Sequence, residues 1–176
     1  MNRARTHTRH RALAVAVAAL ATAGTLAAYA VASSPNQGNR LDAMFTTSVA
    51  VLNNQIATYG IVQVITTGSG AVEGFGPATL TAGVTQDRTV TTCGPGSSVD
   101  QIHYRIVTAN GTLILRVSAT RCLDPSGTPV GRGTFVVDGA ASSGIFAGAT
   151  GEGDSETVVG PTSNNATFTG KLKLTG

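Results

Sequence analysis

The sequence predicts an all-β fold, a closed antiparallel barrel of about eight strands, with a β-sandwich as the alternative. The first observation is composition: the 176 residues include 22 glycines and no tryptophan, and only 12% of them are charged. The second is pattern, because residues 61–174 divide into short apolar or β-branched segments separated by turn residues, without a secure helix. Such a chain is typical of strands joined by tight turns.

Residues 1–32 are predicted to be a cleavable secretory signal peptide. Four arginines precede an uncharged alanine-rich run, and Ala30-Val31-Ala32 supplies a small-x-small cleavage pattern before Ser33. An uncleaved membrane anchor is the alternative, since the run is long enough to span a bilayer. We therefore expect a secreted, extracellular protein with a polar tether at 33–40 and one domain at 41–176.

Removal of the leader changes the charge of the protein. The full chain has 12 Lys+Arg and 9 Asp+Glu, and four of the arginines lie in the leader, so 8 basic and 9 acidic groups remain, net −1. Nucleic acids and anionic membranes are bound by basic surfaces. Neither is expected as a partner of the mature chain, whose 176 − 32 = 144 residues amount to one domain.

The two cysteines, Cys93 and Cys122, are predicted to form one disulfide, because a secreted protein folds in an oxidising compartment. Two free buried thiols are the alternative. Both residues fall at strand ends on the same edge of the predicted sheet, with one strand between them. The chain must therefore curl over that strand for the bond to form.

The first predicted strands follow the leader. Residues 40–57 carry apolar side chains at nearly helical spacing, but the β-branched run 46–51 favours a strand. Residues 61–67 are predicted to be a strand that ends at a glycine turn, 68–70. The next strand is expected to begin at Ala78.

That strand offers a candidate binding site. Ala78, Leu80, Ala82 and Val84 share one face by the period of two, and the same face continues with Gln86 and Arg88. A bulge at Gly83 would instead place Asp87 on that face. Gln86 and Arg88, with Tyr104 on the neighbouring strand, are the candidates for a polar anchor inside the barrel. A solvated barrel mouth is the alternative interpretation.

Asn110-Gly111 predicts a two-residue β-hairpin. This register pairs Ile106 with Leu115 and Tyr104 with Val117 on an apolar face. On the other face it sets Arg105 opposite Arg116, which is unfavourable without a nearby acid. Asp87 is the expected acid.

The remaining segments supply the other predicted strands. Residues 124–129 form a loop, 134–137 and 152–159 form strands, and 160–165 form a turn. In the last strand Phe168, Leu172 and Leu174 alternate with polar residues, which predicts one buried face.

The segment Asp138–Gly153 is dense in glycine and is predicted to be a strand–turn–strand crossing of the barrel. Phe146 is expected to point into the core, and Gly148 to mark a bulge or a close contact. The structural motif comprises Gly144, Phe146, Gly148, Gly151 and Gly153.

This motif resembles the glycine-rich segment of the allene oxide cyclase and dirigent superfamily, and the chain is similar to a group of small secreted bacterial proteins. The resemblance implies an eight-stranded, calycin-like barrel. The chain departs from the family pattern at 140–144, which stands where the family has a Gly-Gly-Thr-Gly run, and at Ile145, which replaces a basic residue. No catalytic residue of either enzyme branch is carried over.

Several chemistries have little support in the sequence. There is no Gly-x-Ser-x-Gly elbow and no nucleotide-binding loop, and His103 is the only histidine after the leader. One histidine and two bonded cysteines do not make a zinc site. Glu152, Asp154 and Glu156 favour a solvated acidic strand over a calcium site. No cofactor and no metal are expected.

Two functions of different classes remain. The favoured hypothesis is a secreted barrel that binds a small apolar ligand or partner in or on the barrel. The alternative is a cofactor-free cyclase or isomerase that acts on a hydrophobic substrate, as in the allene oxide cyclase or dirigent branch. The sequence leaves open whether the protein is an enzyme and what its oligomeric state is.

Overall fold

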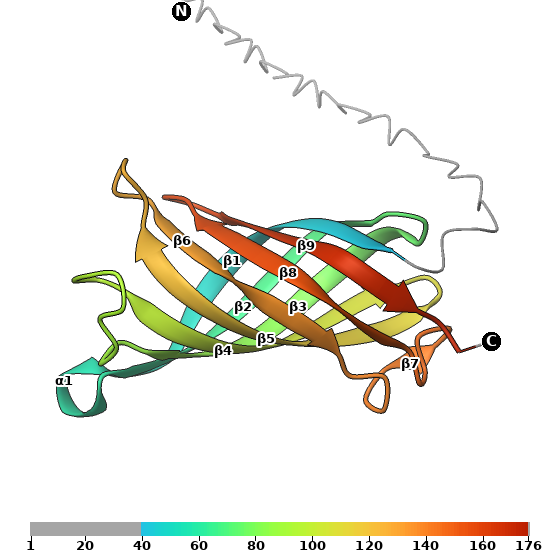
Figure 1. Ribbon diagram of the computed structural model, residues 1–176, viewed down its shortest axis with the longest axis horizontal. Helices are drawn as coiled ribbons and strands as arrows, with labels where there is room; N and C mark the ends of the chain where they lie inside the picture. The colour runs from blue at the N-terminus through green and yellow to red at the C-terminus, as the bar shows by residue number, and fades with distance from the viewer. Residues whose placement is uncertain (1–39, 176) are drawn as a thin grey trace, which may run out of the picture.

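The computed structural model describes residues 40–175, which form a β-barrel with one short helix (Figure 1). The elements are β1 Leu41–Gln55, α1 Ile56–Tyr59, β2 Ile61–Val72, β3 Gly76–Asp87, β4 Ser98–Thr108, β5 Gly111–Leu123, β6 Pro129–Val137, β7 Ser143–Gly144, β8 Thr150–Val159 and β9 Asn164–Lys173. The predicted signal peptide and residues 33–39 of the predicted tether lie outside the described residues.

Eight of the described strands close into a barrel. Their order is β4-β3-β2-β1-β9-β8-β6-β5, every neighbouring pair is antiparallel, and β4 also pairs with β5. The short β7 adds to one end of β5. The predicted closed barrel is confirmed, and the β-sandwich alternative is wrong.

The barrel has two unlike ends. At the closed end, on the right of Figure 1, lie the start of β1, the turns 73–75 and 109–110, and the segment 138–149 with β7. At the open end, on the left, lie α1, the loops 88–97 and 124–128, and the turn 160–163. We use these two names below.

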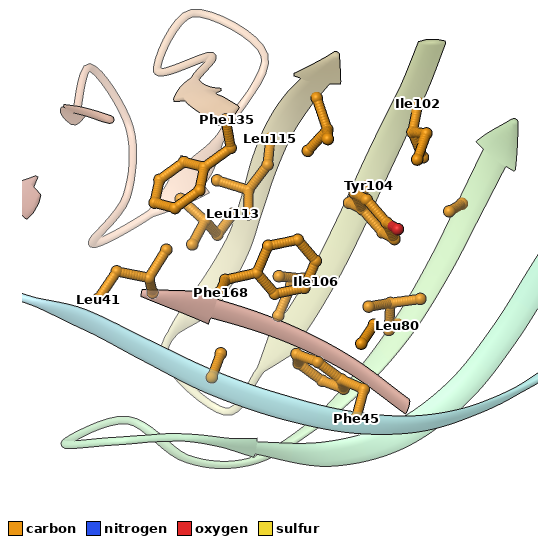
Figure 2. Close-up of a cluster of buried hydrophobic side chains, with 14 of the residues drawn as sticks. Leu41, Phe45, Leu80, Ile102, Tyr104, Ile106, Leu113, Leu115, Phe135 and Phe168 are labelled. Carbon is orange, nitrogen blue, oxygen red and sulfur yellow. The ribbon is translucent and has the colours of Figure 1, made fainter. Parts of the chain in front are cut away.

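Large side chains fill the half of the barrel nearer the closed end. The rings of Phe45, Phe135 and Tyr104 each meet Phe168 edge to face, with ring centroids 6.3, 6.2 and 4.8 Å away (Figure 2). Leu41 and Leu172 are fully buried beside them. Edge-to-face contacts add to the stabilisation that burial provides, so this half is a packed core.

The glycine-rich segment closes that end. Residues 138–149 form a loop with one two-residue strand, so the predicted strand–turn–strand crossing is wrong. Phe146 is nevertheless fully buried, 5.0 Å from the ring of Phe75 between centroids, as predicted for the core. Gly148 has φ +71 and donates its backbone N–H to the carbonyl of Gly139, so it marks a turn in close contact with neighbouring backbone.

The strand prediction for the start of the domain is confirmed, because β1 spans Leu41–Gln55. The inward residues Leu41, Phe45 and Val49 are four apart, a spacing that satisfies both a helix and every second step of a strand. The predicted turn at 68–70 is wrong, because Gly68 and Gly70 lie within β2. A Cβ at either position would collide with the backbone of β1, so glycine here permits close strand approach rather than a turn.

The β4–β5 hairpin differs from the prediction in its register. The turn residues are Ala109 and Asn110, and Thr108 pairs with Gly111. Every pair therefore shifts by two residues: Ile106 faces Leu113 and Tyr104 faces Leu115. A shift of two keeps each side chain on its predicted face.

Gly111 explains this shift. Its φ is +144 and it pairs with Gly144 of β7, where a Cβ would collide with that backbone. Arg105 consequently faces Ile114, and Arg116 faces His103. Asp87 is not the acid beside Arg116, since Arg116 instead pairs with Asp138, the residue directly after β6.

Candidate ligand-binding cavity

A cavity of about 350 Å³ occupies the half of the barrel nearer the open end. Its apolar wall comes from strand residues that face inward: Val62, Val64, Val84, Ile102, Ala119 and Ala166. Its polar lining is Thr47, Thr66, Gln86, Arg88, Asp100, Tyr104, Arg121, Ser155 and Thr157. The turn 160–163 borders its mouth.

Side-chain size explains why only this half is hollow. The inward positions of β1 run from Leu41 and Phe45 at the closed end to Thr47 and Val49 at the open end. In β9, Phe168 is followed toward the open end by Ala166. Eight-stranded barrels are just wide enough for large side chains to fill, so small ones leave the axis empty.

The structure brings the three predicted residues, Gln86, Arg88 and Tyr104, to the lining of this one cavity. β3 pairs with β2 without a register shift, so Gln86 points inward and is buried, and the alternative with a bulge at Gly83 is wrong. Arg88 follows the strand at the exposed rim and donates an Nη2 hydrogen bond to the Gln86 side-chain oxygen at 3.1 Å. Asp87 instead accepts bonds from Thr89.

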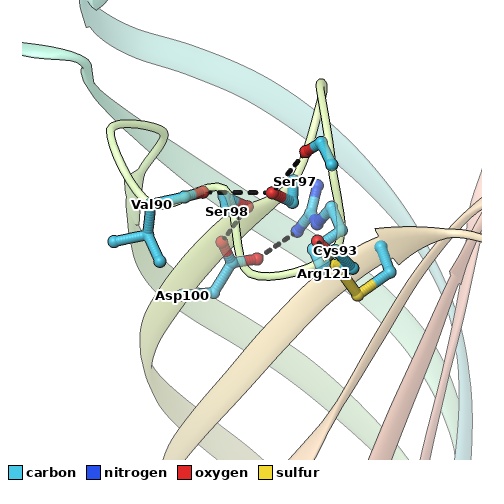
Figure 3. Close-up of a disulfide and its surroundings, with 8 residues drawn as sticks. Val90, Cys93, Ser97, Ser98, Asp100 and Arg121 are labelled. Atoms are coloured by element: carbon cyan, nitrogen blue, oxygen red, sulfur yellow. Dashed lines mark hydrogen bonds and ion pairs between the residues drawn. A yellow bond between two sulfur atoms is a disulfide. The ribbon is translucent and has the colours of Figure 1, made fainter.

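Sequence reasoning missed a buried ion pair in the same wall. Asp100 on β4 is almost fully buried, and one carboxylate oxygen lies 2.5 Å from Nη2 of Arg121 on β5 (Figure 3). Ser98 donates its hydroxyl to the other oxygen at 2.7 Å. The phase of β4 could have indicated this, because Asp100 is two residues before inward-facing Ile102 and four before Tyr104.

Arg121 is only partly satisfied by this pair. Its Nε atom is buried and has no hydrogen-bond partner among residues 40–175. A buried donor without a partner costs free energy unless water or a ligand supplies an acceptor. The open end of the cavity therefore holds unused capacity to bind an acceptor group.

Tyr104 marks the boundary between the cavity and the packed core. Burial raises the pKa of its phenol, while the Thr157 hydroxyl and the positive charge of Arg121 oppose that shift and Asp100 reinforces it. The net direction is upward from the ordinary value of 10.0, so the phenol keeps its proton at neutral pH. It is thus available as a hydrogen-bond donor or acceptor.

The predicted disulfide is present at the open end of the barrel (Figure 3). The Cα atoms of Cys93 and Cys122 lie 5.8 Å apart, within the usual range for a disulfide. The loop 88–97 carries Cys93 to the end of β5, and Ser97 fixes its curl by donating a hydroxyl bond to the carbonyl of Val90 or Gly94, 3.0 and 2.7 Å away. The bond ties this loop to the barrel wall.

The remaining surface adds little chemistry. Within 40–175, the histidine, cysteine, aspartate and glutamate side chains form no group of three that could hold a metal ion. Glu156 on the outer face of β8 pairs with Arg132 at 2.7 Å. None of the helices in the described part of the chain has the length and apolar character needed to cross a membrane. Comparison with known proteins finds no matching family model, no matching curated protein and no matching solved structure.

Proposed function

We propose that this protein is a secreted barrel that binds one small, largely apolar molecule in the cavity at its open end. The observation that carries the proposal is the division of the barrel into a packed half and a hollow half. A cavity of about 350 Å³ lies within the size range of small-molecule sites, which combine apolar walls with a few polar groups.

The polar groups of the lining indicate which chemical group of a ligand would lie beside them. Two cations, Arg88 and Arg121, and one carboxylate, Asp100, line the cavity, so its ionised lining carries one surplus positive charge. The unpartnered Nε of Arg121 adds a donor. We infer an apolar body among the valines and a hydrogen-bond-accepting or anionic group at the arginines.

A dye titration tests this proposal. Anilinonaphthalene sulfonate joins an apolar body to an anionic group, and we expect its fluorescence to rise saturably with one site per chain. Ala119→Trp fills the cavity and should weaken binding at least about tenfold, or 1.4 kcal/mol. Ala71→Trp, at an exposed position on the outside of β2, is the matched control and should bind as the wild type does. Equal affinities of all three proteins would contradict the proposal.

A cofactor-free cyclase or isomerase is the second candidate, favoured by the neutral phenol of Tyr104 beside the Asp100–Arg121 pair. Preorganised donors in a water-poor cavity stabilise charge that develops during a reaction. Incubation with a lipophilic extract distinguishes the two functions. A binder returns its ligand unchanged, whereas an isomerase yields a product of equal mass and altered chromatographic retention. In the isomerase, Tyr104→Phe should retain binding and lose conversion.

Membership of the allene oxide cyclase and dirigent superfamily is part of this proposal. It is supported by the glycine-rich motif around Phe146 and by agreement between the implied and observed barrel. Secretion is supported by the leader sequence. An isomerase test with substrates of either enzyme branch would weigh on the family assignment without affecting the dye titration.

A further inference from the structure

The second half of β1 has a strand partner on only one side. Its pairing with β9 ends where Thr47 meets Asn164, whereas its pairing with β2 continues to Gln55 and Ile61. In the part of the chain that the structure describes, no strand pairs with residues 48–55 on the β9 side. These residues form a free edge, with backbone N–H and C=O groups open to another strand.

Apolar side chains surround this free edge. Val51 and Leu52 are 61% and 64% exposed, and Tyr59 of α1 is 63% exposed. Val49, Ile56 and Ile65 are also exposed. Val49 and Val51 face the mouth of the cavity and Ile65 the outside of the barrel, so apolar side chains flank the open strand edge on both faces. Single exposed apolar residues are ordinary, but several beside an open strand edge are typical of an interaction surface.

The free edge lacks the charged residues and prolines that commonly protect an edge strand from pairing. Residues 43–72, which include the whole hairpin beyond its first two residues, contain no charged residue and no proline. Natural edge strands commonly carry lysine, proline or inward charges that prevent association. A register shift between Val51 and Asn53 twists the strand but leaves its apolar side chains exposed.

We propose that a second copy of this chain pairs antiparallel with residues 48–55 about a two-fold axis. An isologous dimer needs a surface that complements itself, and an uncharged strand edge does so. The partner must offer a free edge and an uncharged apolar flank. Elsewhere the barrel strands carry outward charges, including those of Arg105, Arg132, Glu152 and Lys171. Among residues 40–175, the same hairpin is therefore the surface that fits.

The segment before β1 does not fit as the occupant. It joins β1 at the closed end, whereas the free edge lies toward the open end. Residues 33–40 span at most roughly 28 Å when extended. The distance along β1 from Leu41 to Gln55, the far end of the free edge, is about 46 Å. The chain left after cleavage at Ser33 is therefore too short to pair along the edge.

Pairing of this kind would also extend the cavity wall. Val49 and Val51 line the outer part of the cavity, where β1 has passed the end of β9. A partner strand beside them would replace solvent on that side. Stable interfaces bury about 1,000 Å² or more in total, so α1 and Ile65 must contribute as well as the strand.

Sedimentation velocity of the purified, naturally processed protein tests the proposal across a concentration series. We expect a monomer–dimer equilibrium in the wild type. Leu52→Lys should raise the dimer dissociation constant at least about tenfold, because two like charges would face each other across the axis. Met44→Lys is the matched control: Met44 is 65% exposed on the same strand, where β1 is paired on both sides, and it should dimerise as the wild type does.

A second variant and a second measurement guard against misfolding. Asn53→Lys changes an exposed polar residue and should also weaken the dimer. Backbone amides within residues 48–55 should exchange hydrogen more slowly as the dimer forms. A wild type that stays monomeric up to several hundred micromolar would overturn the proposal. So would a dimer in which those amides gain no protection, or a stable complex at this edge with a different protein.

Discussion

At the scale of single residues, Phe146 shows how one side chain can organise a segment that is otherwise mostly glycine and small residues. It is fully buried against Phe75, while the loop around it turns through Gly144 and Gly148 at positive φ. Glycine allows those turns but fills no space. The closure of this end of the barrel therefore depends on one ring more than on the rest of the loop.

Replacement of Phe146 by alanine should lower the free energy of unfolding by about 3–5 kcal/mol, because it empties a fully buried position. Denaturant titration followed by circular dichroism measures this change. Lys173→Ala, at an exposed position on β9, is the control and should change it by less than about 0.5 kcal/mol. Small, equal losses in both variants would mean that the loop contributes little to the core.

Asp138 is a second residue whose contribution can be measured, through the pH dependence of the stability of the fold. The guanidinium of Arg116 and the backbone N–H of Ala141 hold the pKa of its carboxyl below the ordinary value of 3.8. A depressed pKa contributes stability that is present above the unfolded-state value and is lost as the pH falls through the folded-state value. Asp138 should therefore stabilise the fold above about pH 4 and cease to do so in stronger acid.

The corresponding experiment compares thermal midpoints between pH 6 and pH 2. In Asp138→Asn the midpoint should fall less steeply below pH 4 than in the wild type, because one acid-sensitive contribution is gone. Asp154→Asn, on the outer face of β8, removes a carboxylate that makes no ion pair among the described residues and is the control. A profile for Asp138→Asn that parallels the wild type would contradict this interpretation.

At the scale of elements, the faces of the strands could be predicted and the positions of their turns could not. Local alternation is enough to show that Leu80, Val84 and Gln86 share a face, and no distant contact alters it. The turn after β4 depends on β7, which approaches Gly111 from about thirty residues further along the chain. The turn predicted at Gly68 and Gly70 was wrong for the same reason, because these glycines allow close contact with the distant backbone of β1. Propensity is local, whereas close approach between strands is not.

The candidate site was likewise predicted only in part. Gln86, Arg88 and Tyr104 were predicted because they continue apolar faces into polar positions. Asp100 was missed because a single acid in a strand is ordinarily exposed. Its burial requires Arg121 from the next strand and Ser98 from its own. The observed register of the β4–β5 hairpin brings Ser98 opposite Arg121, whereas the predicted register was shifted by two residues.

The disulfide ties a loop element to the barrel, and its removal should be costly. Cys93 and Cys122 enclose 28 residues, since their sequence separation is 29. A loop of this size constrains the unfolded chain by about 3–4 kcal/mol. The double variant Cys93→Ser with Cys122→Ser should lose about that much unfolding free energy in a denaturant titration. An unchanged transition midpoint would contradict the prediction.

At the scale of the whole molecule, the predicted signal peptide can be tested separately from the barrel. The eight described strands close the barrel within residues 41–173. The predicted cleavage near Ser33 would therefore leave every one of these strands intact. N-terminal sequencing of protein from culture medium should give a start near Ser33. A membrane-bound species that retains Met1 would contradict export with cleavage.

The contact between Phe75 and Phe146 at the closed end also determines how molecules can enter and leave the barrel. A barrel that is open at both ends can pass a solute through its axis, but here Phe75 and Phe146 block the closed end. Anything inside must leave by the mouth through which it came, and water must be displaced along the same path. Exchange of one occupant for another should then require the first to depart before the second arrives. In a chase experiment, the release rate of a bound dye should be independent of competitor concentration.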